Sequence, residues 1–351
     1  GVAGDSGPWR MGRLGGVYSP GLGVNGGLLL LASEDVDSYS KGKSDRCGLG
    51  NGKQEPDGLR KELPQDDSCF KGSGMTFGKK VRVIVLYGYG INCENEMAHG
   101  CRLAGADVVD IVHLNELLRG EVVLDQYHFL NLPGGFLDGD DLGAAKAAAN
   151  RLRYARVGQG GESFQDQLLR FVTEGNLIFG ICNGFQLMVK LGLVPGFDGS
   201  YTTQQVTLTF NDSGRFEDRW VYLKINEKSP CVFTRGIKGV YLPVRHGEGK
   251  FIPGGEAVRE KLKGRNLIVA QYSDPSFTGD VMDYPLNPNG SIDAVAGICD
   301  ERGRLFGMMP HPEAYLHFTN HPRWTREDLP EEGMGLAFFR NAVEYIREEL
   351  L

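Results

Sequence analysis

The segment Asn176-Leu177-Ile178-Phe179-Gly180-Ile181-Cys182-Asn183-Gly184-Phe185-Gln186 decides the fold of this chain. Residues 176–181 are predicted to form a buried strand, and a helix follows Cys182 at once. This G-x-C-x-G spacing is the thiol counterpart of the nucleophile elbow, a strained strand-to-helix turn whose flanking positions tolerate little bulk. The helix N-terminus directs its positive end toward the sulfur. Cys182 is therefore the predicted nucleophile, and a buried structural cysteine at a sheet edge is the alternative.

Outward from this segment, short apolar strands alternate with helices, which indicates a parallel sheet covered on both faces. We predict an α/β fold with a flavodoxin-like, mostly parallel sheet and helices on both faces. Ligands of such folds bind beyond the carboxyl ends of the strands. The first half has predicted strands at Val81–Tyr87, Asp107–Val112 and Tyr127–Leu132 and helices at Glu94–Ala104 and Phe164–Glu174. The second half has predicted strands at Val206–Phe210, Trp220–Ile225, Val240–Val244, Leu267–Tyr272 and Ala294–Ile298, and a helix from Met334 to Glu349.

A general base for the thiol is predicted in Met309-Pro310-His311-Pro312-Glu313. The two prolines favour an extended backbone, in which residues two apart project to the same side. Glu313 would then hold one nitrogen of His311 while the other nitrogen faces the thiol. A proline-rich surface turn is the alternative reading.

Acyl chemistry also needs N–H donors for the developing oxyanion. The backbone N–H of Asn183, directly after the nucleophile, is one predicted donor. Gly135, in the loop Leu132-Pro133-Gly134-Gly135-Phe136 after the preceding strand, is the second. An ordinary glycine turn is the alternative for this loop.

Together these residues resemble class I, triad-type glutamine amidotransferases. Further segments narrow the resemblance to the glutaminase subunit or domain of phosphoribosylformylglycinamidine synthase, and it covers about 79–351. One departure is Ala314, where many relatives carry arginine. These segments are Gly90-Ile91-Asn92-Cys93-Glu94, Asn211-Asp212-Ser213-Gly214-Arg215-Phe216-Glu217, Arg245-His246-Gly247-Glu248-Gly249-Lys250-Phe251, Asn287-Pro288-Asn289-Gly290-Ser291 and Met308-Met309-Pro310-His311-Pro312-Glu313.

The resemblance implies a class I amidotransferase fold and hydrolysis of L-glutamine to glutamate and ammonia through a thioester on Cys182. It implies Gln186 and His246 as substrate contacts, and no cofactor in this chain. The ammonia would go to a synthetase partner that converts phosphoribosylformylglycinamide to the amidine in purine synthesis. ATP and Mg are expected on that partner, and a small bridging subunit is a further candidate partner.

The composition is that of a globular protein, with 41% hydrophobic and 24% charged residues. The formal net charge of -7 gives no reason to expect binding to nucleic acid or to a membrane surface. The seven cysteines are scattered without a C-x-x-C pair, which disfavours a disulfide framework or a zinc site, so we expect no bound metal and a reducing compartment. No apolar run approaches the roughly 20 residues of a membrane helix. The chain is therefore expected in the cytoplasm.

The leader, residues 1–78, is rich in Gly, Ser, Asp and Lys and lacks a sustained period. We predict that it is largely disordered and separate from the amidotransferase domain at 79–351. Deleting residues 1–74 should therefore leave folding and catalysis essentially unchanged. Thermal melts and turnover of the truncated and full chains would check this, and aggregation or a much lower melting temperature would contradict it.

Several alternatives stay open at this point. Cys93 is the rival nucleophile, although it lacks flanking glycines. His246 is a second candidate base, and Gly88-Tyr89-Gly90 is a weak dinucleotide-binding pattern without its third glycine. The loop Tyr284–Ser291 is either a surface turn or a partner-facing segment. A different class of function is a flavodoxin-like binding module whose thiol senses redox state, and release of ammonia from glutamine would exclude it.

Overall fold

A computed structural model describes residues 80–279 and 281–351 of the chain. The predicted disordered leader, with Cys47 and Cys69, lies outside the described residues. The five cysteines within them are buried and free. None of the helices in these described stretches has the length and apolar character needed to span a bilayer.

The described residues form an alternation of strands and helices in the first half and a β-rich second half. The strands are β1 Arg82–Tyr87, β2 Val108–His113, β3 Phe129–Leu132, β4 Leu177–Ile181, β5 Val206–Thr209, β6 Glu217–Ile225, β7 Gly239–His246, β8 Lys250–Pro253, β9 Ile268–Ser273, β10 Val295–Cys299 and β11 Leu305–Met308. The α-helices are α1 Glu94–Leu103, α2 Leu114–Arg119, α3 Lys146–Tyr154, α4 Phe164–Thr173, α5 Asn183–Leu191, α6 Glu256–Gly264 and α7 Leu336–Tyr345, and a π-helical turn Ile346–Leu350 follows α7.

Within the part of the chain that the structure describes, nine strands form one sheet in the order β2-β1-β3-β4-β11-β10-β9-β6-β7. The five strands from β2 to β11 are parallel. From β11 to β7 each neighbouring pair is antiparallel. β5 and β8 form a separate antiparallel pair. The predicted fold class is confirmed, and most strands of the second half extend the same sheet.

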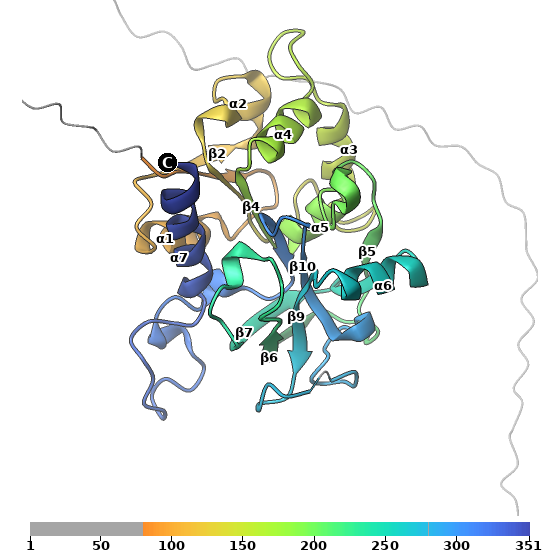
Figure 1. The fold of residues 1–351 in the computed structure, drawn as a ribbon, viewed down its shortest axis with the longest axis vertical. Coiled ribbons are helices and arrows are strands. Elements are labelled where there is room, and N and C mark those ends of the chain that lie inside the picture. Colours follow the sequence, from red (N-terminus) through yellow and green to blue (C-terminus); the bar gives the residue numbers. More distant parts are fainter. Residues whose placement is uncertain (1–79, 280) are drawn as a thin grey trace, which may run out of the picture. The chain divides into compact units, whose positions relative to one another are not determined.

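Helices cover the parallel part of the sheet on both faces. Figure 1 shows α1 and α7 together on one side and α3, α4 and α5 together on the other. Glycines in the strands let α5 approach closely: a Cβ at Gly180 would lie 2.4 Å from Met188 Sδ, and one at Gly307 would lie 2.0 Å from the Phe185 ring. On the opposite face Phe179 stacks on Phe306 at 5.3 Å between centroids. The two glycines therefore set how near the helix after Cys182 sits to the sheet.

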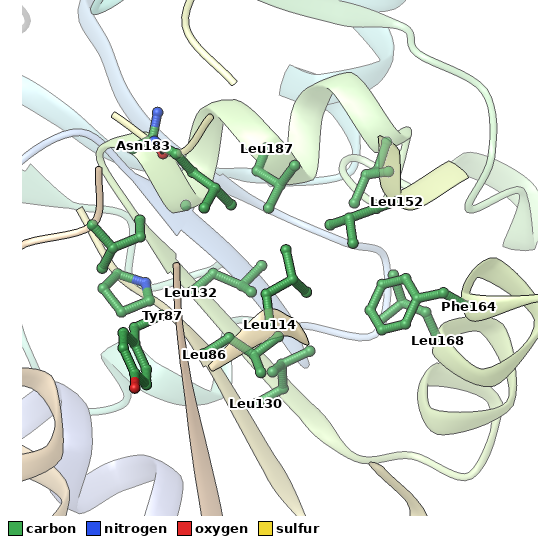
Figure 2. A pocket seen from close by; sticks show the side chains of 15 residues that line it. Leu86, Tyr87, Leu114, Leu130, Leu132, Leu152, Phe164, Leu168, Asn183 and Leu187 are labelled. Carbon is green, nitrogen blue, oxygen red and sulfur yellow. Dashed lines mark hydrogen bonds between the residues drawn. The ribbon is translucent and has the colours of Figure 1, made fainter. Parts of the chain in front are cut away.

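Figure 2 shows the apolar layer between the sheet and the helices α3, α4 and α5. Leu86, Leu130 and Leu132 point from the sheet toward Leu152 of α3, Phe164 and Leu168 of α4, and Leu187 of α5. The side chains leave a cavity of only about 20 Å³, with Asn183 at one end of its lining. This layer is core, because the space holds no more than a water-sized group.

The hydrophobic patterns of the sequence did not predict β8, β11, α2, α3 or α6. β11 is the consequential omission, because the chain that leaves it carries His311. Its four residues, Leu-Phe-Gly-Met, are too few to show a period and contain a glycine. The last predicted helix extends too far at its start: α7 begins at Leu336, and its final turn is π-helical.

Candidate active site

The predicted elbow forms at Cys182, between the buried strand β4 and the helix α5. Cys182 has φ 52° and ψ −103°, a backbone conformation that non-glycine residues rarely adopt. Its amide N–H donates to the carbonyl of Met308 at 2.8 Å, and its carbonyl accepts from Gln186 N–H at 3.0 Å. The side chain is 6% exposed, and its thiol donates to the carbonyl of Arg245 at 3.4 Å. The strand, the helix and β11 thus hold the sulfur in one place.

Gly184 allows the elbow to pack on the neighbouring strand, because a Cβ there would lie 1.9 Å from the carbonyl oxygen of Leu132. We expect Gly184→Ala to lower the melting temperature by several degrees, since overpacking against backbone costs about 1–3 kcal/mol. Turnover should also fall, because the displaced strand β3 leads directly into the loop that contains Gly135. Gly264→Ala is the matched control, since nothing lies within 4 Å of a Cβ there. Equal melting temperatures for the two variants would contradict this account.

The topology brings His311 to the elbow. β4 and β11 are parallel neighbours in which Ile181 is paired with Met308. The segments that follow these two strands therefore leave the sheet at the same end. Cys182 is the next residue on one chain, and His311 follows three residues after Met308 on the other. The His311 amide N–H donates to the carbonyl of Pro243 at 2.8 Å, which fixes the turn.

The imidazole of His311 bonds Glu313 through Nδ1, at 2.6 Å from Oε1. The predicted extended backbone is wrong here: Pro312–Ala314 is a 3-10 turn, and this turn brings the two side chains together. Although burial opposes it, the Glu313 carboxylate and the nearby thiols of Cys182 and Cys93 raise the pKa of His311 well above its ordinary value. Because Nδ1 donates to the carboxylate, Nε2 is the nitrogen left for proton transfer.

The two predicted oxyanion donors lie on segments that are tied together. Gly135 has φ 141°, and a Cβ there would lie 2.5 Å from the carbonyl oxygen of Gly90. Gly135 forms an isolated β-bridge with Ile91. The two hydrogen bonds of this bridge run from Asn92 N–H to the Gly134 carbonyl and from Phe136 N–H to the Gly90 carbonyl. The Gly135 N–H takes part in neither bond. The Asn183 side chain accepts from Leu137 N–H at 3.0 Å and so fixes this loop to the elbow.

A cavity of about 300 Å³ opens over Cys182, His311 and Glu313, and Gly135 lines it. Four buried side-chain atoms of its lining have no hydrogen-bond partner among the described residues. Buried polar atoms are normally paired, so this cavity is built for a ligand that supplies donors and acceptors. The four atoms are His311 Nε2, Glu313 Oε2, His246 Nε2 and Asp140 Oδ1.

The rival cysteine, Cys93, lies in the same cavity. The Cys93 sulfur, a ring nitrogen of His311 and a carboxylate oxygen of Glu313 all lie within 4.8 Å of one another. It has φ −115° and ψ 14°, without the strain of an elbow, and its thiol donates to Asn92 Oδ1 at 3.2 Å. Burial raises the pKa of Cys93, against the effect of His311, and so favours its neutral thiol. Proximity alone does not separate the two thiols, but the backbone favours Cys182.

The two predicted substrate contacts both line the cavity but differ in their free groups. Gln186 is engaged at both ends, accepting from Asn183 Nδ2 at 3.1 Å and donating to the carbonyl of Glu248 at 2.7 Å. His246 contacts Asn211 Oδ1 through Nδ1 at 3.1 Å and leaves Nε2 unpaired. Because Asn211 donates its amide hydrogens to two carbonyls, its oxygen must accept, so Nδ1 of His246 carries the proton. Burial, with His311 nearby, lowers the pKa of His246 to about 3, so Nε2 is a neutral acceptor.

Three of the segments quoted from the sequence meet in one buried network behind this wall. Asn211 accepts from Gly249 N–H at 2.9 Å, and Asn289 donates to the carbonyl of Gly249 at 2.8 Å. Ser291 Oγ donates to Asn289 Oδ1 at 2.7 Å, and Asn287 donates to the carbonyl of Ser291 at 3.0 Å. The end of the loop Tyr284–Ser291 is therefore buried and is not a plain surface turn, although Tyr284 itself is 59% exposed.

The chain is similar to known glutamine amidotransferases over most of the described region. Residues 80–346 match the CobB/CobQ-like glutamine amidotransferase domain. The chain is 45% identical over 271 residues to phosphoribosylformylglycinamidine synthase subunit PurQ of Dehalococcoides mccartyi, covering 77% of this chain and 99% of that protein. The same subunit of Methanococcus maripaludis is 41% identical over 277 residues, 76% of this chain and 98% of that protein. The chain belongs to this family of glutamine amidotransferases.

A solved structure agrees with this membership. The structure of PurLQS from Thermotoga maritima matches with a TM-score of 0.55 and 26% identity, over 76% of this chain and 100% of that chain. All candidate residues of the site, from Gly135 to Glu313, fall within the stretch 80–346 that the family matches.

Asp140 was missed by sequence reasoning, because an aspartate in a glycine-rich loop carries no signal of its own.

Proposed function

We propose that this chain hydrolyses L-glutamine through a triad of Cys182, His311 and Glu313. The observation that carries the proposal is the juxtaposition of a strained cysteine elbow with an imidazole whose Nδ1 is held by Glu313 and whose Nε2 is unpaired. The elbow and the base lie in one cavity of about 300 Å³, the size class of a small-molecule site.

The proposed reaction has two halves. His311 Nε2 takes the thiol proton as Cys182 Sγ attacks the carboxamide carbon of glutamine, and the N–H groups of Gly135 and Asn183 stabilise the oxyanion. The protonated imidazole then gives its proton to the departing nitrogen, so that ammonia leaves and a γ-glutamyl thioester remains. Water, deprotonated by His311, attacks the thioester through a second oxyanion and releases glutamate and the thiol. Glu313 keeps the imidazole oriented and stabilises its positive form.

The ammonia is proposed to pass to a synthetase partner, with or without a small bridging subunit, that makes phosphoribosylformylglycinamidine in the cytoplasm. The chemistry at Cys182 needs no cofactor from this chain, and ATP and Mg would be used on the partner. Residues 79–351 are proposed to form the amidotransferase domain.

The test measures ammonia released from glutamine by the purified full chain, with and without a synthetase subunit. We expect glutamine-dependent ammonia, increased when the synthetase and its substrates are present. A folded chain that releases none in either condition would overturn the proposal and favour a redox-sensing binding module.

A further inference from the structure

Asp140 lies in the cavity without a role in the chemistry described above. It belongs to the loop between β3 and α3, and its carbonyl accepts from Gly143 N–H at 2.8 Å. An ion pair between Asp138 and Arg151, 3.1 Å long, ties the same loop to α3. The Asp140 carboxylate faces the cavity, and its buried Oδ1 has no partner among the described residues. The loop therefore holds a carboxylate oxygen ready to accept a hydrogen bond from a ligand.

The charges around Asp140 leave room for a cation. Glu248, 8% exposed, lines the same cavity, and its Oε2 accepts from Ala144 N–H at 3.1 Å. Burial and Glu248 together raise the pKa of Asp140. Lys190 of α5, 9% exposed, is the ammonium group that acts on both carboxylates. Asp140 and Glu248 act on each other as like charges, so a positive charge between them would relieve their repulsion.

Asp140 and Glu248 line the same cavity as Cys182. Gln186 lies one helical turn after Cys182, and its side chain links the elbow to the carbonyl of Glu248. Glu248 is thus bonded through its backbone carbonyl to a residue one turn of α5 from Cys182. Glutamine carries its α-ammonium group three carbons from its carboxamide. This group offers three N–H donors and a positive charge.

We propose that Asp140 binds the α-ammonium group of glutamine, and so selects an α-amino acid over a simple amide. This proposal rests on the proposed glutaminase function and adds the residue that sets its substrate class. Asp140 is a specificity residue, because it contacts the substrate away from the reacting carboxamide.

The test compares glutamine with glutaramate, the analogue in which hydrogen replaces the α-amino group. We expect Asp140→Asn to lower kcat/KM for glutamine roughly 30-fold or more, mainly through KM, since it removes the charge that would pair with the ammonium group. The same variant should change kcat/KM for glutaramate by less than about 3-fold, because that substrate has no ammonium group to lose. Asp140→Glu should restore part of the preference for glutamine.

Asp141→Asn is the matched control, since Asp141 is exposed and does not line the cavity. Equal losses of Asp140→Asn on both substrates would reveal a merely structural role, and unchanged glutamine kinetics would refute the contact. Calorimetric binding of glutamine in the Cys182→Ala background separates the two proposals. In that background, weaker glutamine binding caused by Asp140→Asn would support the contact even if the catalytic assignment failed. A wild-type chain without turnover would contradict the proposed glutaminase function but not the Asp140 contact.

Discussion

Replacing Cys182 by alanine is expected to remove essentially all glutamine hydrolysis, by roughly 10,000-fold or more. The substitution deletes the only atom that can form the thioester at the elbow. It should not disturb the fold, because alanine has the same Cβ as cysteine and adds nothing at the φ of 52° that the turn requires. The backbone bonds of residue 182 to Met308 and Gln186 do not involve its side chain.

The measurement is ammonia release at saturating glutamine with the synthetase present, together with a thermal melt. Cys93→Ala is the informative comparison, because its sulfur lies in the same cavity and near the same imidazole. That variant should retain most of the turnover. Turnover that survives in a folded Cys182→Ala protein, and disappears in Cys93→Ala, would move the nucleophile to Cys93.

His311→Ala should lose nearly all turnover, because the thiol loses its proton acceptor and the departing ammonia loses its proton donor. Glu313→Gln should lose less, roughly 10- to 1,000-fold, since an amide still holds the ring but carries no compensating charge. The same change should lower the pH at which His311 titrates, because the Glu313 carboxylate is what raises the pKa of His311 against its burial.

Turnover of both variants at saturating glutamine, and the pH profile of Glu313→Gln, decide this division of roles. A large difference between the two variants is the expected result. Equal and mild losses would place the base elsewhere. His246 would then be the next histidine to substitute, since its Nε2 is unpaired in the same cavity.

Much of this site could be predicted because its groups are encoded by local spacing. The elbow is a contiguous motif, and its two flanking glycines are required because a Cβ at either position would lie less than 2.5 Å from a neighbouring atom. His311 and Glu313 stand two residues apart, so any compact turn brings them together. The 3-10 turn that does so is not predictable from the two prolines, which favour an extended chain.

Non-local groups were not predictable in the same way. Asp140 enters the cavity from a loop whose path is set by glycines and by the ion pair to Arg151. The roles of Asn211, Asn289 and Ser291 depend on three segments meeting behind His246. Their hydrogen bonds join residues up to 42 positions apart, and no spacing rule covers such a distance.

The sequence by itself determined the parallel α/β half of the fold and the prediction of Cys182 as the nucleophile, because strand periodicity and a strained turn are properties of a few consecutive residues. Only the tertiary structure decided which residues share a cavity with Cys182. The parallel pairing of β4 with β11, a strand too short to be recognised, brings His311 to Cys182 across 129 positions, from Cys182 to His311. The protonated nitrogen of His246 and the unpaired oxygen of Asp140 were likewise decided there, since both depend on which buried groups found a partner and which did not.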